Sequence, residues 1–180
     1  VGINNVTLKS GSTELINNTS TSGIDYYTNF ADKVLPAKLT FGGTYDLSIG
    51  RNTISNSVNY KAWIDWNIDG DFADAGEEVF SSGTISGASA TGKFTVPDIS
   101  NSFEGNTRMR VGVSYGAFSN SYCGVNTVGE FEDYVLNLAN DGKPPVITLV
   151  GGDTVRVEKT ATKTACYSEV AGTTFKANDA

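Results

Sequence analysis

The sequence predicts an all-β fold: an antiparallel β-sandwich, jelly-roll or immunoglobulin-like, with a short β extension at the C-terminal end. Short runs in which apolar and polar residues alternate recur at fairly regular spacing, as is typical of sandwich strands. Gly, Ser, Asn and Asp, which favour turns, separate these runs. Because no window shows a capped amphipathic helix, helices are not expected. Periodicity alone leaves the choice between the two sandwich types open.

In chain order, strands are expected at residues 3–8, 37–41, 44–49, 58–66, 92–97, 109–115 and 131–138. Two glycines separate the second run from the third, so these two strands are expected to join through a turn. The run that begins at Met109 has the clearest pattern, because every second residue is apolar and one face suits a core. In the run that begins at Val58, Trp66 shares a face with Ile64, whereas Trp63 lies on the other face. The last run is partly apolar on both faces.

A change of composition after residue 139 marks a boundary. Residues 140–145 read Asn-Asp-Gly-Lys-Pro-Pro, and paired prolines after Asp-Gly form a stiff, extended joint. We therefore expect one sandwich over residues 1–139 and a linker over 140–145. In residues 146–180, two apolar runs around Gly-Gly-Asp suggest a hairpin. Since roughly 40 residues is the lower limit for an independent core, this part is expected to be a partial β segment or a tail docked on the sandwich.

Charge and composition exclude several classes of function. The chain carries a formal net charge of −7, and an acidic surface opposes binding to nucleic acid or to an anionic membrane. No apolar run reaches the roughly 18 residues of a membrane-spanning helix. The absence of His removes the Ser-His-Asp triad and the usual general base near neutral pH. We therefore expect no enzyme, and a glycosidase that works through two carboxylates is the catalytic class left open.

The strongest local signal is an acidic segment at residues 65–78, called the acidic loop below. Oxygen-bearing side chains occupy alternate positions from Asp65 to Asp71, and Gly70 stands where a calcium loop turns sharply. This spacing predicts that the loop wraps one Ca²⁺ ion, which would relieve repulsion between the carboxylates. The alternative is a solvated turn rich in Asp and Gly. The expected ligands are Asp65, Asn67, Asp69, Asp71, Asp74 and Glu77, rather than Glu78.

Several motifs together resemble the GEVED domain family. Residues 63–72 (WIDWNIDGDF) and 75–78 (AGEE) are similar to its acidic stretch. The motif that names the family appears as GEFEDY at 129–134, with Phe at the usual Val position. Further similar stretches are TRMRV at 107–111, INNTS at 16–20 and YYTNF at 26–30. The resemblance covers about residues 1–138 and implies a β-sandwich accessory module of secreted, multidomain bacterial proteins, with no established catalytic activity.

A shorter resemblance concerns the tail. Residues 144–149 (PPVITL) are similar to the opening of bacterial immunoglobulin-like repeats. The two resemblances together imply a modular parent protein, such as a protease, a polysaccharide-degrading enzyme or an adhesin. The neighbouring domains of that parent are therefore expected partners of this chain.

The acidic residues of the GEFEDY motif allow three interpretations. Glu130 and Glu132 share one side of the expected strand, and Arg108 and Arg110 need partners if they lie on a sheet face. Cross-strand ion pairs between these two sets would satisfy both. The alternatives are paired catalytic carboxylates, with Asp133 included, or a contribution to a metal site.

Aromatic residues in or beside the expected loops are candidates for sugar binding, because a ring face can stack on a sugar ring. For any single residue, packing in the core or anchoring of a loop is the alternative. Trp63 lies inside a strand and is expected in the core. The candidate ligand contacts are Trp66, Phe72, Tyr26, Tyr27, Phe118 and Tyr122.

The two cysteines, Cys123 and Cys166, lie on opposite sides of the expected linker. A disulfide between them is reasonable in a secreted acidic protein and would pin the tail to the sandwich. In GEVED-like domains, however, a cysteine just before the naming motif often has its partner upstream of the region where this chain begins. That pattern would leave Cys123 without Cys166 as its partner.

Together these observations predict a non-catalytic binding or targeting module of a larger protein, secreted or on the cell surface and stabilised by calcium. The favoured partner is an extracellular polysaccharide, and a collagen-like protein comes second. The main alternative is a structural spacer or adhesin stalk domain that binds nothing itself. A carboxylate-based glycosidase is the third.

Overall fold

The computed structural model describes residues 1–20, 26–98, 104–118, 122–123 and 128–139. These residues form β-strands and no helix, so the predicted all-β class is confirmed. The part of the chain that the structure describes therefore has no helix that could cross a membrane. The expected linker at 140–145 and the expected β segment at 146–180 lie outside the described residues.

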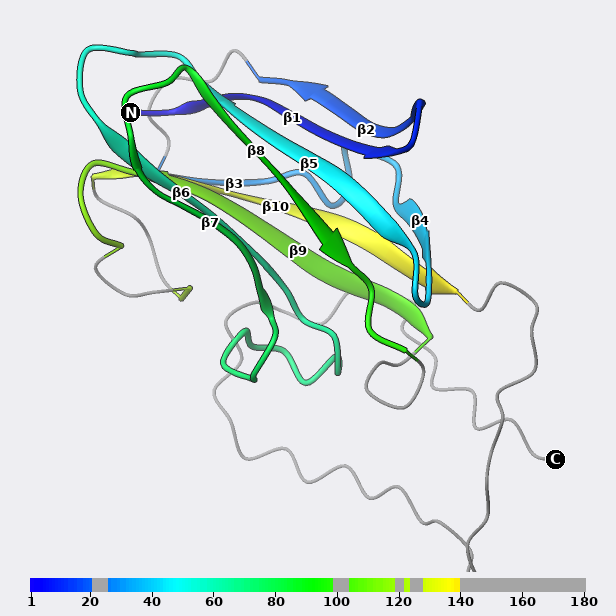
Figure 1. Ribbon diagram of the computed structural model, residues 1–180. Helices are drawn as coiled ribbons and strands as arrows, with labels where there is room; N and C mark the ends of the chain where they lie inside the picture. The colour runs from blue at the N-terminus through cyan, green and yellow to red at the C-terminus, as the bar shows by residue number, and fades with distance from the viewer. Residues whose placement is uncertain (21–25, 99–103, 119–121, 124–127, 140–180) are drawn as a thin grey trace, which may run out of the picture.

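The strands, in chain order, are β1 (Ile3–Ser10), β2 (Thr13–Thr19), β3 (Tyr27–Asn29), β4 (Ala37–Thr40), β5 (Thr44–Arg51), β6 (Val58–Ile64), β7 (Glu78–Ile85), β8 (Ser89–Thr95), β9 (Gly105–Ser114) and β10 (Gly129–Ala139). They form two sheets (Figure 1). One sheet has four strands in the order β2-β1-β5-β8. The other has six, in the order β3-β10-β9-β6-β7, with β4 also paired to β10.

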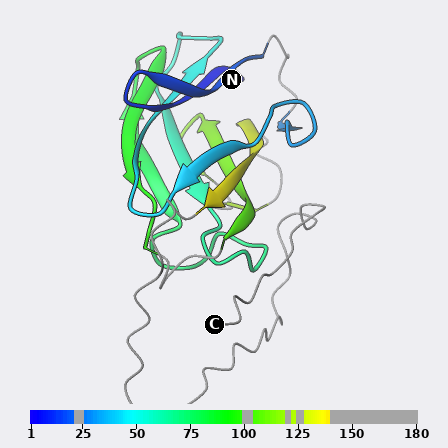
Figure 2. The same cartoon turned by 90° about the vertical axis from the view of Figure 1, so that its right-hand side faces the viewer.

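The two sheets face each other as the layers of a sandwich (Figure 1). All strand pairs are antiparallel except two, since β3 and β4 each run parallel to β10. Figure 2 shows β4 beside β10 at the edge of the larger sheet. The predicted sandwich is therefore confirmed, although the pairing is mixed rather than purely antiparallel.

The main core lies between the sheets. The apolar face predicted from alternation on β9, with Met109, Val111 and Val113, packs with Tyr60 and Ile64 of β6 in this core. The smaller sheet contributes residues of β1, β5 and β8 to the same core. Alternation places every second side chain of each strand inward, which is why the single-face pattern of β9 predicted its core residues correctly.

Three strands lack an obvious signal in the sequence. β2 is an edge strand of the smaller sheet, β7 is an edge strand of the larger one, and β3 is only three residues long. Apart from Ile16, no residue of these three strands is fully buried. Because an edge strand packs on fewer neighbours, its sequence needs less apolar alternation and resembles that of a loop.

Candidate metal loop and the buried arginine beside it

The acidic loop connects β6 to β7 and is tied to the sheet at both ends. Asp65 follows the last residue of β6, and its backbone N–H donates to the carbonyl of Arg108 on β9 at 3.1 Å. The hydroxyl of Thr107, also on β9, donates to the carbonyl of Asp65. At the other end, the carbonyl of Glu77 accepts from the N–H of Ile64 at 2.9 Å. The loop therefore starts and ends on the sheet itself.

Two fully buried carboxylates organise the base of the loop. Asp65 accepts from the N–H groups of Asp69 and Gly70, at 3.2 and 3.0 Å. Glu77 accepts from the N–H groups of Trp66 and Asp74, at 3.0 and 3.2 Å. These bonds fold the loop back on itself, and Gly70 has the positive φ of 94° that such a sharp turn requires.

Side chains further along the loop repeat one local pattern. Asn67, Asp69 and Asp71 each accept a hydrogen bond from the backbone N–H two residues ahead, at 3.1, 3.2 and 2.8 Å. This is the Asx-turn, which holds the backbone in a tight curve. The acceptor oxygens of the loop are therefore placed by its own backbone.

Three carboxylates converge in this curve. Oxygen atoms of Asp69, Asp71 and Asp74 all lie within 4.8 Å of one another. Asp71 is buried, Asp69 is half-buried and Asp74 is exposed. The amide of Asn67 donates to the Asp74 carboxylate at 2.6 Å. An all-oxygen donor set of this kind fits a hard cation such as Ca²⁺.

The structure divides the predicted ligands into two groups. The carboxylates of Asp69, Asp71 and Asp74 form the cluster, with Asn67 attached to it. Asp65 and Glu77 lie outside that cluster and bind backbone N–H groups at the base of the loop. Burial raises the pKa of the Glu77 carboxyl to about 8, and the neighbouring Asp65 and Asp74 carboxylates add to the rise. Extra positive charge nearby would therefore favour the ionised form of Glu77.

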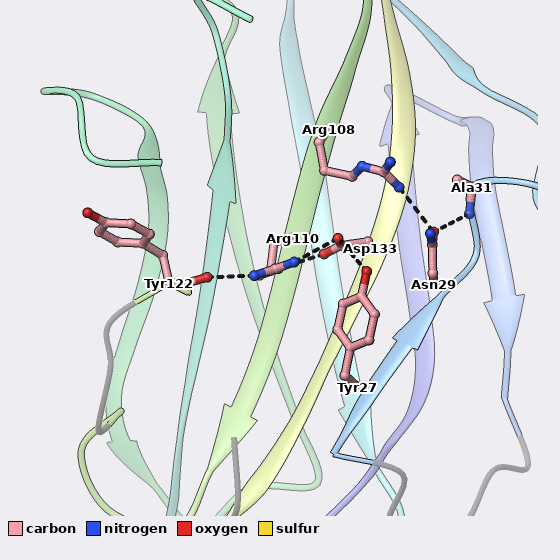
Figure 3. A network of polar contacts seen from close by, with 7 residues as sticks. All are labelled: Tyr27, Asn29, Ala31, Arg108, Arg110, Tyr122 and Asp133. Carbon is pink, nitrogen blue, oxygen red and sulfur yellow. Dashed lines mark hydrogen bonds and ion pairs between the residues drawn. The ribbon is translucent and has the colours of Figure 1, made fainter. Parts of the chain in front are cut away.

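Beside the loop, on the outer face of the larger sheet, lies a buried ion pair (Figure 3). Arg110 on β9 stands directly opposite Asp133 on β10. Its Nε and one terminal nitrogen donate to the two carboxylate oxygens at 2.7 and 2.8 Å. The hydroxyl of Tyr27 on β3 donates to the same carboxylate at 3.0 Å. Neither charged side chain is more than 2% exposed, so each depends on the other for its charge balance.

Aromatic rings enclose the guanidinium of Arg110. Its central carbon lies 5.3 Å from the ring centre of Tyr27, 5.4 Å from that of Phe72 and 5.5 Å from that of Phe131. The second terminal nitrogen donates to the backbone carbonyl of Tyr122 at 2.7 Å. The rings exclude water from the ion pair, which strengthens its electrostatic attraction.

These rings belong to a second apolar cluster, separate from the main core. It contains Trp63, Phe72 and Phe131, with Tyr27, Phe118 and Tyr122 packed against them. Gly112 lies beneath the rings of Phe118 and Phe131, where a Cβ would come within 2.8 Å of both. A glycine is therefore needed in the middle of β9. The signal that could have predicted this cluster is the aromatic residue that each outer face carries among polar ones, Trp63 on β6 and Phe131 on β10.

The predicted ion pairs of Glu130 and Glu132 with the two arginines are wrong. Glu130 stands opposite Val113 and Glu132 opposite Val111, so both side chains point to the face of β10 away from Arg110. The arginines lie on the outer face, where Asp133 pairs with Arg110 and Asn29 accepts from Arg108 at 3.0 Å (Figure 3).

The two glutamates instead connect strands of the sandwich from inside. Glu130 accepts from the N–H of Ile3 at 2.7 Å and from the hydroxyl of Thr28 at 3.1 Å. Glu132 accepts from the hydroxyls of Ser20 and Tyr134 at 3.0 and 2.7 Å. Burial raises the pKa of the Glu132 carboxyl to about 7. Both glutamates are fully buried, which supports a structural role for the motif.

The aromatic candidates for ligand contact differ widely in their exposure to solvent. Trp66 and Phe72 are only 4% and 3% exposed, so their proposed role in stacking on a ligand is wrong. The indole N–H of Trp66 donates to the carbonyl of Gly76 at 3.1 Å, and its ring packs in the main core. Tyr27, Phe118 and Tyr122 are half-buried in the second cluster. Tyr26, at 45% exposed, is the most accessible of the candidates.

The predicted disulfide joins one described cysteine, Cys123, to one that lies outside the described residues, Cys166. Cys123 lies next to Tyr122 in the connection between β9 and β10 and is half-buried. Cys123 is disulfide-bonded, as predicted, and the assignment of Cys166 as its partner stays a prediction.

Comparison with known proteins supports the family resemblance. Residues 59–137 match the sequence model of the GEVED domain. The matched stretch contains the acidic loop, Arg110 and Asp133, together with both buried glutamates. A search of curated proteins finds no match to the chain. The resemblance of the tail to immunoglobulin-like repeats stays a prediction.

Proposed function

Because the chain carries a GEVED domain at residues 59–137, we propose that it serves a secreted or cell-surface protein as a non-catalytic β-sandwich module whose acidic loop binds calcium. The observation that carries the proposal is the convergence of three carboxylates, from Asp69, Asp71 and Asp74, within 4.8 Å. Each comes from a loop whose backbone curve is fixed by internal hydrogen bonds.

The chemistry of the loop favours calcium over a transition metal. The cluster offers carboxylate oxygens, with an amide-bearing Asn67 beside it, and neither His nor Cys occurs in the loop. Ca²⁺ accepts six to eight oxygen ligands in flexible geometry, including water and backbone carbonyls. A bound Ca²⁺ would supply positive charge to a loop that otherwise gathers carboxylates at close range. Asp69, Asp71 and Asp74 would hold it, and Asp65 and Glu77 would keep the loop in shape.

The binding role of the module is also a proposal, with polysaccharide as the favoured ligand and collagen-like protein second. Since Trp66 and Phe72 are buried, the aromatic candidates that remain are Tyr26, Tyr27, Phe118 and Tyr122. The spacer alternative is favoured by one specific observation, namely that the aromatic residues beside the acidic loop pack inward around Arg110. The proposed partners include the neighbouring domains of the parent protein.

A catalytic role for the GEFEDY carboxylates is not favoured by their surroundings. Glu130, Glu132 and Asp133 are each 0% exposed. The first two bind groups inside the sandwich, and Asp133 is paired with Arg110. A glycosidase needs two carboxylates that reach a substrate. This observation supports the non-catalytic proposal.

Isothermal titration calorimetry with CaCl₂ tests the metal site directly, with MgCl₂ as the comparison. Extracellular calcium modules bind in roughly the 10⁻⁴–10⁻³ M range, so the titration must extend to several millimolar. We expect one saturable calcium site and weaker binding of magnesium. No heat of binding with either ion would exclude the site. Retention on a panel of insoluble glycans and collagen then separates the binding module from the spacer.

A further inference from the structure

Phe72 belongs to both the acidic loop and the cluster around Arg110. It follows Asp71 directly and lies between Asp69 and Asp74, so the three converging carboxylates flank it in the chain. Its own side chain packs with Trp63 and Phe131 on the outer face of the larger sheet and is 3% exposed. Any change in the backbone that brings the carboxylates together must therefore also move this ring.

The ring of Phe72 contacts both Arg110 and Tyr122 on the outer face of the larger sheet. It lies 5.4 Å from the guanidinium carbon of Arg110 and 6.4 Å from the ring of Tyr122, edge to face. Tyr122 belongs to the connection between β9 and β10, some 50 residues further along the chain. Within the described residues, Phe72 is therefore a point where the acidic loop touches that connection.

Arg110 forms the second contact between the same two segments. Its guanidinium packs against the ring of Phe72. It also donates to the backbone carbonyl of Tyr122 at 2.7 Å (Figure 3). The guanidinium is itself held by two hydrogen bonds to Asp133. Because Asp133 holds the guanidinium of Arg110 in place, Phe72 and Tyr122 both contact the same fixed group.

We infer that cation binding in the acidic loop is coupled to the seating of Tyr122 on the sheet, through Phe72 and Arg110. The inference rests on the proposed calcium site and adds a role for residues that bind no ion. Two events that favour the same position of a shared group reinforce each other. Calcium would hold Phe72 on Arg110, which favours the seated Tyr122, and by reciprocity a seated Tyr122 raises the affinity for calcium.

The test compares calcium affinity in the unchanged protein with that in Phe72→Leu and Tyr122→Leu. Leucine keeps much of the buried apolar volume, so both variants are expected to fold, and thermal unfolding in chelator checks that they do. Neither substitution removes a carboxylate. Phe41→Leu is the matched control, because Phe41 packs on the main core and not on the cluster around Arg110.

We expect each of the two test variants to weaken calcium binding about 5- to 10-fold, the lower range of measured couplings between sites, with no change in Phe41→Leu. The double variant should lose less than the product of the two single losses, since both act on one contact. In the unchanged protein, calcium should also slow amide hydrogen exchange at Tyr122 and Cys123, and this slowing should vanish in Phe72→Leu.

Three other outcomes would overturn the inference in distinguishable ways. Unchanged affinity in both variants would leave the calcium site intact and remove the coupling. A loss in Phe72→Leu alone would confine the role of Phe72 to the acidic loop. An absence of calcium binding by the unchanged protein would remove both the proposed site and the coupling.

Discussion

Arg110 and Asp133 occupy directly opposed positions on β9 and β10, and their side chains form a two-pronged ion pair on the outer face of the sheet. The pair is buried under Tyr27, Phe72 and Phe131. Removal of one partner would leave the other as an unpaired charge with no access to water. The pair is therefore expected to be sensitive to single substitutions and tolerant of a matched double one.

Asp133→Ala is expected to lower the free energy of unfolding by about 3–5 kcal/mol, because it leaves the buried guanidinium of Arg110 without its ion-pair partner. The double variant Arg110→Met, Asp133→Leu should recover much of that loss. Urea unfolding measures both. Asp46→Ala is the control, since its pair with Lys93 is exposed and should contribute less than about 1 kcal/mol. A double variant as unstable as Asp133→Ala would show that the packing of the rings around position 110 depends on the positive charge of the arginine.

The stability of the sandwich should fall as pH rises through neutrality. The folded-state pKa of Glu132 is raised to about 7 from an ordinary 4.5, so the folded protein holds a proton that the unfolded chain has lost. The contribution of Glu132 to the free energy of unfolding is therefore fully present below pH about 4.5 and is lost as pH rises through about 7. The difference in pKa limits it to about 3 kcal/mol.

Glu132→Gln tests that pH dependence by thermal unfolding between pH 5 and 8.5 in chelator. The variant should show a smaller loss of melting temperature across this range than the unchanged protein. A residual slope is expected from Glu77, whose raised pKa acts in the same direction. Glu14→Gln, at an exposed position on β2, should retain the full slope. Identical slopes in Glu132→Gln and the unchanged protein would contradict the prediction.

Asp69→Ala should destabilise the protein in millimolar calcium and much less in chelator. The lost carboxylate matters chiefly when the ion is bound, because binding to the folded state alone raises stability. Differential scanning calorimetry with and without calcium measures the difference. Glu78→Ala is the control, since Glu78, the first residue of β7, pairs with Lys61 of β6 and lies outside the carboxylate cluster. Equal destabilisation of Asp69→Ala in both conditions would instead indicate a hydrogen-bonded turn.

Trp66→Ala should lose about 3–5 kcal/mol of stability, because it removes a buried side chain and the hydrogen bond to Gly76. Tyr26→Ala should leave the melting temperature nearly unchanged, since its side chain is 45% exposed. If the module binds glycans through aromatic stacking, Tyr26→Ala should reduce retention on an insoluble glycan. Retention at the level of the unchanged protein would remove Tyr26 as a contact.

The sequence predicted the fold class and the core face of β9, because alternation maps directly onto burial in a two-layer sandwich. The same parity rule placed Trp66 with Ile64 on the buried side, and the structure agrees. Alternation did not predict edge strands such as β2, since most of its residues are exposed and can be either polar or apolar. Alternation thus predicts the centre of a sheet better than its edges.

For the site, spacing predicted where the carboxylates lie along the loop but not which way each one points. Asp65 and Glu77 turned out to bind backbone N–H groups at the base. The partner of Arg110 depends on the register between β9 and β10, and that register follows from long-range packing rather than from local pattern. A shift by one residue would have exchanged the roles of Glu132 and Asp133.

The place of β10 in the larger sheet has a consequence for how the chain is made. This strand is the last of the described strands to leave the ribosome, yet it pairs with β3, β4 and β9. Among the described strands, the short parallel strands β3 and β4 pair with β10 alone in the larger sheet. About 100 further residues must therefore be synthesised after β3 before its partner exists. Topologies of such long sequence separation fold slowly and expose unpaired edges meanwhile. Nascent chains that end before residue 129 should therefore be the ones that chaperones and proteases recognise.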